Sequence, residues 1–264
     1  MYTRVRLFAG AAFLAAATLA GSAASAATAN LSMQSFAPRD LSGARGTLDG
    51  FLQAHQVSNR RAETFEEFDA WNGARGTANP ANTKVGSFRA TGDAGNGRSV
   101  VGSGRDLQVR GDNVMPWGRY NTDALPDGLV GGKWLDSNDN TGMEWTISGL
   151  GAFNFVGFFL NDVADVGGVF SIQVAGEGFT RSFADLAGAA GRLPNGGLHL
   201  VLIELSEAVE ELTISMGHNR TNDGFGIDGA MLARVAPVPL PPAAALLAGG
   251  LALIAGFRRR PRPV

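Results

Sequence analysis

The chain has 264 residues, of which 45% are hydrophobic and 17% are charged, and it contains no cysteine. Disulfides, thiolate metal sites and cysteine nucleophiles are therefore excluded, and the apolar content is high enough to form a core, which argues against wholesale disorder. The formal net charge of −2 gives no reason to expect nucleic acid as a partner.

The first 26 residues have the three parts of a secretory signal peptide in order. Arg4 and Arg6 precede an uncharged apolar run from Leu7 to Ala20, and Ala24-Ser25-Ala26 supplies the small residues that signal peptidase accepts. The alternative is a membrane anchor or a buried helix, but the run is too short to span a bilayer comfortably. We therefore predict a signal peptide over residues 1–26 and an exported body.

The near-neutral total charge hides an acidic body. Residues 1–26 and 238–264 together carry six arginines and no acidic residue, so residues 27–237 hold 16 basic and 24 acidic residues and a net charge of −8. Such a surface favours divalent cations and disfavours phosphate backbones and anionic lipid.

Residues 27–62 are polar and mixed, and we predict that they form a separate segment ahead of the folded domain. Within them, Leu48, Phe51 and Leu52 follow helical spacing, which predicts a short helix over residues 47–56.

From residue 63 the pattern changes to short apolar runs separated by glycine-rich turns. Phe153–Leu160 is nearly all apolar, which predicts a central strand buried on both faces. Strands are predicted at Thr64–Trp71, Lys84–Thr91, Met143–Ser148, Phe153–Leu160, Val169–Ala175, Leu198–Leu205, Val209–Met216 and Phe225–Val235. We expect an all-β antiparallel β-sandwich over residues 63–236, jelly-roll-like because it exceeds the ~100 residues of an immunoglobulin-like sandwich.

The segment 237–264 has the features of a membrane helix with a basic tail. Leu240 to Phe257 is a run of 18 residues without a charge, followed by Arg258, Arg259, Arg260 and Arg262. At ~1.5 Å per residue the run is about 27 Å long, close to the ~30 Å hydrocarbon core of a bilayer. Arginines remain on the cytoplasmic side, so the helix would cross with its N-terminal end outside. A buried C-terminal helix is the alternative.

Val238-Pro239-Leu240-Pro241, the apolar helix and the arginine cluster together resemble the tripartite sorting signal of the PEP-CTERM family in its VPLPA variant, with Pro242 in place of the alanine. The resemblance implies that an exosortase of a Gram-negative, exopolysaccharide-making bacterium recognises this signal. The sorting residues would be Val238, Pro239, Leu240, Pro241, Arg258, Arg259 and Arg260. The body would then be held transiently in the inner membrane before it reaches the cell surface or the medium.

The body also resembles the β-sandwich ectodomains that precede such tails and, more distantly, carbohydrate-binding jelly rolls. The similar strings include Glu63-Thr64-Phe65-Glu66 and Gly226-Ile227-Asp228. In those jelly rolls, acidic residues of the first and last strands hold a structural calcium ion. Asp228 lies in an apolar strand, where a buried carboxylate needs a partner, so Glu66, Asp69 and Asp228 form one candidate calcium site.

Asp136-Ser137-Asn138-Asp139-Asn140 is a second candidate calcium site. Calcium takes six to eight oxygen ligands, and Asp136, Asn138, Asp139 and Asn140 supply four side chains of the right chemistry. The alternative is a turn in which these side chains cap their own backbone.

Four further residues are candidates for a sugar site. Asp162 and Asp165 follow the most apolar strand and would bind a sugar hydroxyl or a cation, unless the loop is simply solvated. Trp117 and Tyr120 lie in a turn-rich stretch and offer stacking surfaces, with a role in the core or in anchoring a loop as the alternative.

No motif in the chain indicates catalysis. HExxH, the Walker A loop and GxSxG are absent from the sequence, so we do not expect an enzyme. The expected function is that of an exported surface or matrix protein whose sandwich binds polysaccharide or mediates adhesion. The alternatives are a glycan-active enzyme that uses two carboxylates and an unprocessed single-pass membrane protein.

Overall fold

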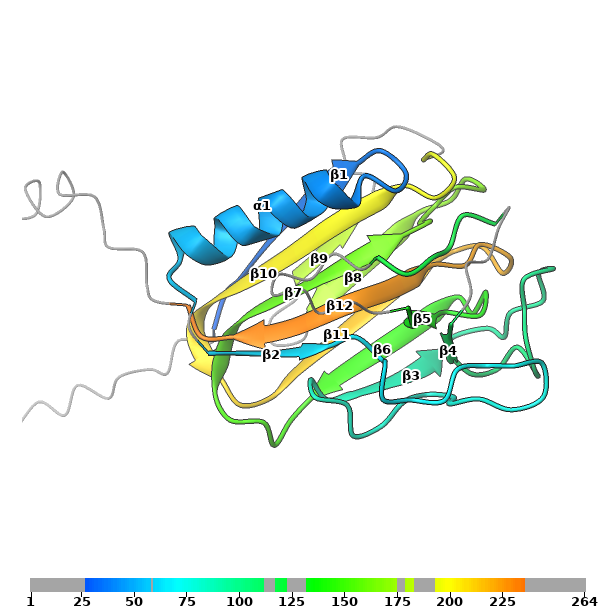
Figure 1. The fold of residues 1–264 in the computed structure, drawn as a ribbon, viewed down its shortest axis with the longest axis horizontal. Helices are drawn as coiled ribbons and strands as arrows, with labels where there is room; N and C mark the ends of the chain where they lie inside the picture. The colour runs from blue at the N-terminus through cyan, green and yellow to red at the C-terminus, as the bar shows by residue number, and fades with distance from the viewer. Residues whose placement is uncertain are drawn as a thin grey trace, which may run out of the picture.

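The structure is a computed structural model, and it describes residues 27–57, 59–111, 117–122, 132–174, 179–182 and 193–235. Two antiparallel sheets lie face to face, and a single helix among these residues covers the outer face of the larger sheet (Figure 1). The prediction of an all-β antiparallel sandwich is therefore confirmed for the described part of the chain.

The larger sheet contains seven strands in the order β1-β10-β7-β12-β5-β4, with β2 paired to β12. Their bounds are β1 Ala29–Phe36, β2 Arg60–Glu63, β4 Gln108–Arg110, β5 Trp134–Asp136, β7 Phe153–Asn161, β10 Leu198–Val209 and β12 Gly226–Ala233. The smaller sheet has the order β3-β6-β11-β8-β9. Its strands are β3 Ser87–Thr91, β6 Gly142–Ile147, β8 Phe170–Val174, β9 Phe179–Ser182 and β11 Leu212–His218.

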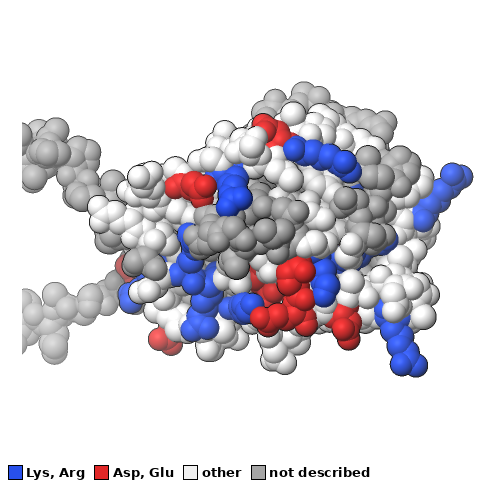
Figure 2. All heavy atoms as spheres, in the orientation of Figure 1, with Lys and Arg blue, Asp and Glu red and all other residues white. Residues whose placement is uncertain are grey.

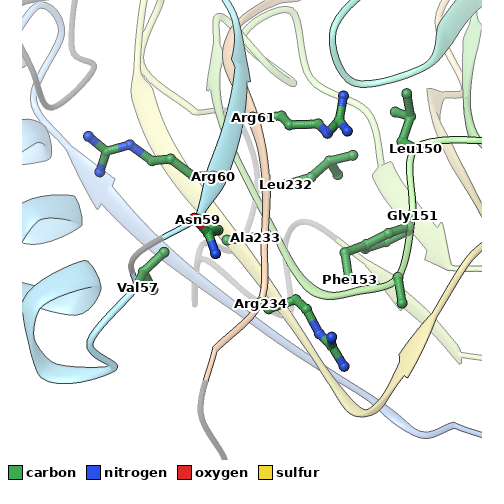
Figure 3. Close-up of a pocket in the computed structure, with 11 residues that line it drawn as sticks. Val57, Asn59, Arg60, Arg61, Leu150, Gly151, Phe153, Leu232, Ala233 and Arg234 are labelled. Atoms are coloured by element: carbon green, nitrogen blue, oxygen red, sulfur yellow. The ribbon is translucent and has the colours of Figure 1, made fainter.

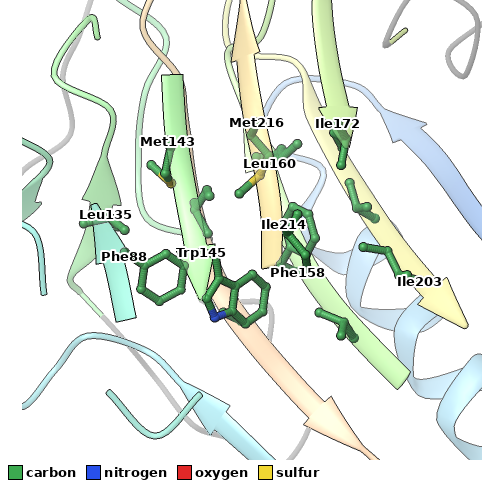
Figure 4. Packing of buried hydrophobic residues seen from close by; sticks show 14 of the residues in the cluster. Phe88, Leu135, Met143, Trp145, Phe158, Leu160, Ile172, Ile203, Ile214 and Met216 are labelled. Atoms are coloured by element: carbon green, nitrogen blue, oxygen red, sulfur yellow. The ribbon is translucent and has the colours of Figure 1, made fainter. Parts of the chain in front are cut away.

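The main hydrophobic core fills the space between the two sheets. Trp145 of β6 stacks on Phe88 of β3 with ring centroids 5.0 Å apart and meets Phe158 of β7 edge to face at 5.7 Å (Figure 4). The indole N–H of Trp145 donates to the carbonyl of Val85 at 2.9 Å, so its one polar group is satisfied although the side chain is fully buried.

The central position of strand β7 explains why its sequence is almost entirely apolar. It lies between β10 and β12, and its side chains alternate between two cores. Val156, Phe158 and Leu160 face the smaller sheet, whereas Phe155 and Phe159 face the helix side. The predicted strand, central and buried on both faces, is confirmed.

The N-terminal segment belongs to the sandwich, which corrects the expectation of a separate segment over residues 27–62. Strand β1 pairs along its whole length with β10, from Ala29 opposite Leu205 to Phe36 opposite Leu198. Helix α1, Leu41–Ala54, begins earlier than the predicted helix because Asp40 caps it by accepting a hydrogen bond from the N–H of Gly43 at 3.0 Å.

The predicted strand Thr64–Trp71 is wrong, because the strand in this region, β2, comes before it. Phe65 has a φ of 61°, and the N–H of Phe68 donates to the carbonyl of Phe65 at 3.1 Å, which makes a turn. The side chain of Glu63 holds this turn in place by accepting from the N–H of Phe65 at 2.7 Å and from that of Lys84 at 2.9 Å. Strands β1, β2, β4, β5 and β9 were not predicted.

The register of the central strands defines two ends of the sandwich. Asn161, where β7 ends, lies opposite Gly226, where β12 begins, and Gly226 also lies opposite Asp136 at the end of β5. We call this the loop end. At the other end β1 begins at Ala29 and β12 finishes at Ala233, and we call this the chain-exit end (Figure 1).

The predicted signal peptide (1–26) and sorting segment (237–264) lie outside the described residues. Within the described ranges, no helix has both the length and the apolar character needed to cross a membrane.

Candidate binding pocket at the loop end

The register of the larger sheet brings three loops together at the loop end. One loop follows β5, one follows β7 and one precedes β12. Strand β12 pairs with both β5 and β7, so the three loops lie at the same end of the sheet. Their sharp reversals place non-glycine residues in the left-handed backbone region, with φ values of 56° at Asn138, 59° at Asp139 and 63° at Asp162. Asn and Asp adopt this region more readily than most residues, which explains their abundance in these loops.

The loop predicted to bind calcium, Asp136–Asn140, is built around a buried arginine. Arg119 is 1% exposed and contacts Asp136 directly, and its second nitrogen lies 2.9 Å from Oδ1 of Asp139. Nη1 of Arg110 lies 3.3 Å from the other carboxylate oxygen of Asp136. Burial raises the pKa of the Asp136 carboxyl, and the charges of Arg119 and Arg110 oppose that rise.

The remaining side chains of this loop also have protein partners. The amide of Asn138 accepts from the N–H of Val101 at 2.7 Å and donates to its carbonyl at 2.9 Å. The amide nitrogen of Asn140 donates to the carbonyl of Ser137 at 2.7 Å. The loop matches the alternative interpretation, a turn that caps its own backbone, only in the Asn138–Asp136 and Asn140–Ser137 hydrogen bonds. Other partners, among them Val101 and two arginines, come from elsewhere in the fold.

The other candidate calcium site does not assemble around Asp228. Oδ2 of Asp228 accepts from the N–H of Thr122 at 2.8 Å and from its hydroxyl at 3.1 Å. Glu66 accepts instead from the N–H of Lys133 at 2.6 Å, and Asp69 is solvent-exposed. The turn at Phe65 ends β2 before these two residues, so they do not continue along β12. Among the described residues, no group of three or more acidic or histidine side chains is arranged to hold a metal ion.

A cavity of about 520 Å³ opens at the loop end, lined by these three loops and by residues around 97–99, 117–119 and 195. Three residues predicted from sequence as sugar contacts, Trp117, Asp162 and Asp165, line it, and Trp117 is 39% exposed at its edge. The other lining residues are Gly97, Arg98, Ser99, Arg119, Asp139, Val166, Asn195, Asn222 and Gly224.

For Tyr120 the structure supports the alternative interpretation, a buried side chain that anchors a loop. Tyr120 is 3% exposed and does not line the cavity. Its hydroxyl donates to the carbonyl of Gly196 at 2.9 Å and accepts from the N–H of Arg39 at 2.9 Å. The N–H of Gly196 in turn donates to Oδ1 of Asp162 at 2.7 Å, so Tyr120 holds the loop that orients Asp162.

Two carboxyl groups beside the cavity are strongly perturbed. Burial raises the pKa of Asp162 to about 8, and the charge of Asp165 adds to the rise. Burial likewise raises the pKa of Asp223 to about 8, again with a contribution from Asp165, which lies within hydrogen-bonding reach of it. Asp223 is 1% exposed, and apart from the neighbouring carboxyl of Asp165 its two carboxylate oxygens have no hydrogen-bond partner among the described residues. A buried carboxylate without a donor is costly unless it is protonated or meets a cation or a ligand.

Sequence reasoning did not single out Arg119 and Asn195, which line this pocket, or Asp223, which lies beside it next to the lining residues Asn222 and Gly224. Asn195 and Asp223 lie in Asn-Gly-Gly and Asn-Asp-Gly stretches, which were interpreted only as turns. Arg119 carries no local signal, because its partners Asp136 and Asp139 are 17 and 20 residues further along the chain.

Comparison of the chain with protein-family models and with curated proteins finds no match.

Proposed function

We propose that this protein is exported and that its sandwich binds a polyhydroxylated ligand, a polysaccharide segment, in the loop-end pocket. The supporting observation is the combination found there: an exposed tryptophan, Trp117, beside the buried carboxylates Asp162 and Asp165 and the amide of Asn195. Aromatic faces stack on the apolar faces of sugars, and carboxylates and amides accept or donate hydrogen bonds to hydroxyl groups. A jelly-roll-like relationship to carbohydrate-binding sandwiches is part of this proposal.

Export and sorting rest on the two ends of the sequence. The signal peptide over residues 1–26 would direct secretion, and the Val238–Pro241 motif with its apolar run and arginines would direct exosortase processing at the inner membrane. Mass spectrometry of the mature protein tests this directly. The expected chain begins at Ala27 and ends near Pro241, and recovery of a chain with both Met1 and Val264 would contradict the proposal.

We further propose that calcium occupies the pocket with the ligand. Its carboxylate ligands would be Asp165 and Asp223, with Asp162 close by, in place of the two sites predicted from sequence. Calcium readily completes its shell with amide and backbone oxygens, water and ligand hydroxyls, so two carboxylates suffice. The buried carboxylate of Asp223 supports this choice, because among the described residues only the carboxyl of Asp165 lies within hydrogen-bonding reach of it.

The experiment is binding of the mature protein to an array of bacterial and plant polysaccharides, with calcium and with EDTA. Trp117→Ala and Asp162→Asn are expected to weaken binding about tenfold or more, the equivalent of ~1.4 kcal/mol. The matched controls are Val169→Ala, an exposed apolar residue outside the cavity lining, and Asp69→Asn, an exposed carboxylate. The absence of any glycan bound, or equal losses in the controls, would contradict the proposed binding function. Release of reducing ends from a polysaccharide would show instead that the protein hydrolyses glycans.

A further inference from the structure

A second cavity, of about 700 Å³, lies at the chain-exit end of the sandwich. Three arginines and no acidic residue contribute to its lining, although the body as a whole is acidic. Arg60 and Arg61 belong to β2, and Arg234 is the residue just after β12. Arg60 pairs with Ala233 and Arg61 with Leu232, so the pairing of these two strands brings the arginines to the same cavity.

Two of the arginines face the same side of the cavity. Figure 3 shows Arg61 and Arg234 extending on the side of the Leu150–Phe153 turn, whereas Arg60 points in the opposite direction, toward helix α1. The alternation of side chains along β2 explains this difference between Arg60 and Arg61. Figure 2 shows Lys and Arg side chains over the region of β2 in the face that is drawn, with Asp and Glu side chains beside them.

The charges of Arg61 and Arg234 are not neutralised within the described structure. Both side chains are solvent-exposed, and neither forms an ion pair with another described residue. Residues 236–264 contain no acidic side chain that could neutralise them. Guanidinium groups are geometrically suited to bind phosphate oxygens in pairs, so this arrangement selects an anion.

The lining also contains apolar residues, which indicates an amphipathic anion. Leu150 is half-buried beside Arg61 and Arg234, and Phe153 and Leu232 are core side chains, each 3% exposed, that reach the same cavity (Figure 3). Arg234 is also only six residues before Leu240, where the uncharged run begins. At up to ~3.4 Å per residue, six residues span about 20 Å, so a tail inserted in a bilayer would hold this cavity near the lipid headgroups.

We propose that the chain-exit cavity binds the phosphate of an anionic membrane lipid between Arg61 and Arg234, with the half-buried Leu150 against the apolar part of the lipid. The membrane-facing orientation rests on the proposed export and sorting, but lipid binding does not depend on the loop-end pocket. The general expectation that the acidic body avoids anionic lipid does not apply locally, because the field at a surface site is set by nearby charges.

The test uses the full chain in a neutral detergent, titrated with short-chain phosphatidylglycerol, short-chain phosphatidylcholine or inorganic phosphate. Phosphatidylglycerol is expected to bind at least tenfold more tightly than either of the other two. The double variant Arg61→Gln/Arg234→Gln is expected to lose that advantage, and added salt is expected to reduce it.

The matched control is Arg75→Gln/Arg105→Gln, which removes the same charge from two exposed arginines that are not in the lining. It is expected to change the affinity less than twofold. Equal binding of inorganic phosphate would show a site for a free anion and overturn the lipid proposal, as would binding that the double variant leaves unchanged. Polysaccharide binding by the double variant, measured in parallel, reports the proposed function separately and shows that the variant is folded.

Discussion

Arg119 shows how one side chain organises the loop end. It reaches from the segment before β5 to Asp136 and Asp139, and all three side chains are buried. A buried ion pair contributes less to stability than its geometry suggests, because desolvation of the charges costs energy. Losing one partner is much more damaging, because the remaining charge stays buried without compensation.

We therefore expect Arg119→Met to lower the free energy of unfolding of the protein by about 3–5 kcal/mol. Urea denaturation followed by circular dichroism measures this change. Arg89→Met is the matched control, since Arg89 is 65% exposed and pairs on the surface with Glu144 at 2.7 Å. Loss of this surface ion pair is expected to lower the free energy of unfolding by less than about 1 kcal/mol. Equal costs for the two variants would show that the buried arginine has no special structural role.

Asp223 gives the stability of the body a defined pH dependence. Its pKa rises from an ordinary 3.8 to about 8 on folding, so in the window between these values the unfolded chain has released a proton that the folded chain retains. The raised pKa of Asp223 therefore favours the folded state fully below about pH 4. This stabilisation falls as the pH rises from 4 and is lost once the pH has passed about 8.

In EDTA, we expect Asp223→Asn to be more stable than the native sequence at pH 8, by about 1 kcal/mol or more, and equal to it at pH 4. Thermal melts across this range measure the difference, with Asp69→Asn as the control. Calcium is expected to raise the melting temperature of the native sequence at pH 8 but not that of Asp223→Asn. A calcium response that survives this substitution would place the ion elsewhere.

At the scale of elements, helix α1 and strand β7 depend on each other. Leu48 and Leu52 of the helix pack with Phe155 and Phe159, which β7 projects away from the inter-sheet core, and Phe51 stacks on Phe155 with ring centroids 4.9 Å apart. Without the helix, the outer face of a central strand would expose two phenylalanines to water. The helix thus completes a third layer over the sandwich.

Leu48→Ala is expected to destabilise the protein by about 2–5 kcal/mol, because Leu48 is 1% exposed and its loss leaves a cavity under the helix. Chemical denaturation measures the effect. Gln53→Ala, on the exposed side of the same helix, is expected to change stability by less than about 0.5 kcal/mol. If Leu48→Ala changed stability as little as Gln53→Ala, helix α1 would not be docked on the sheet.

At the scale of the whole molecule, the sandwich has two chemically different ends. Buried carboxylates gather in the loop-end pocket, whereas the chain-exit cavity is lined by Arg61 and Arg234, which form no ion pair with another described residue. If the proposed sorting segment holds the protein in a membrane, this polarity would place the arginines near the lipid headgroups and the proposed sugar pocket at the opposite end of the sandwich.

The sequence by itself determined the all-β class and the central position of β7. Alternation and continuous apolarity are local consequences of which faces a strand buries, so they can be read along the chain. The edge strand β1 escaped prediction because it pairs with only one neighbour and buries only Leu31 fully.

Only the tertiary structure decided which polar residues act together. Asp136 and Asp139 were predicted from their spacing as calcium ligands, but the fold supplies Arg119 as their partner. Asp162 and Asp165 come to lie beside Asp223 because β7 and β12 are neighbours that run in opposite directions. Spacing along a chain describes what one loop offers, whereas a site depends on which loops the sheet register brings together.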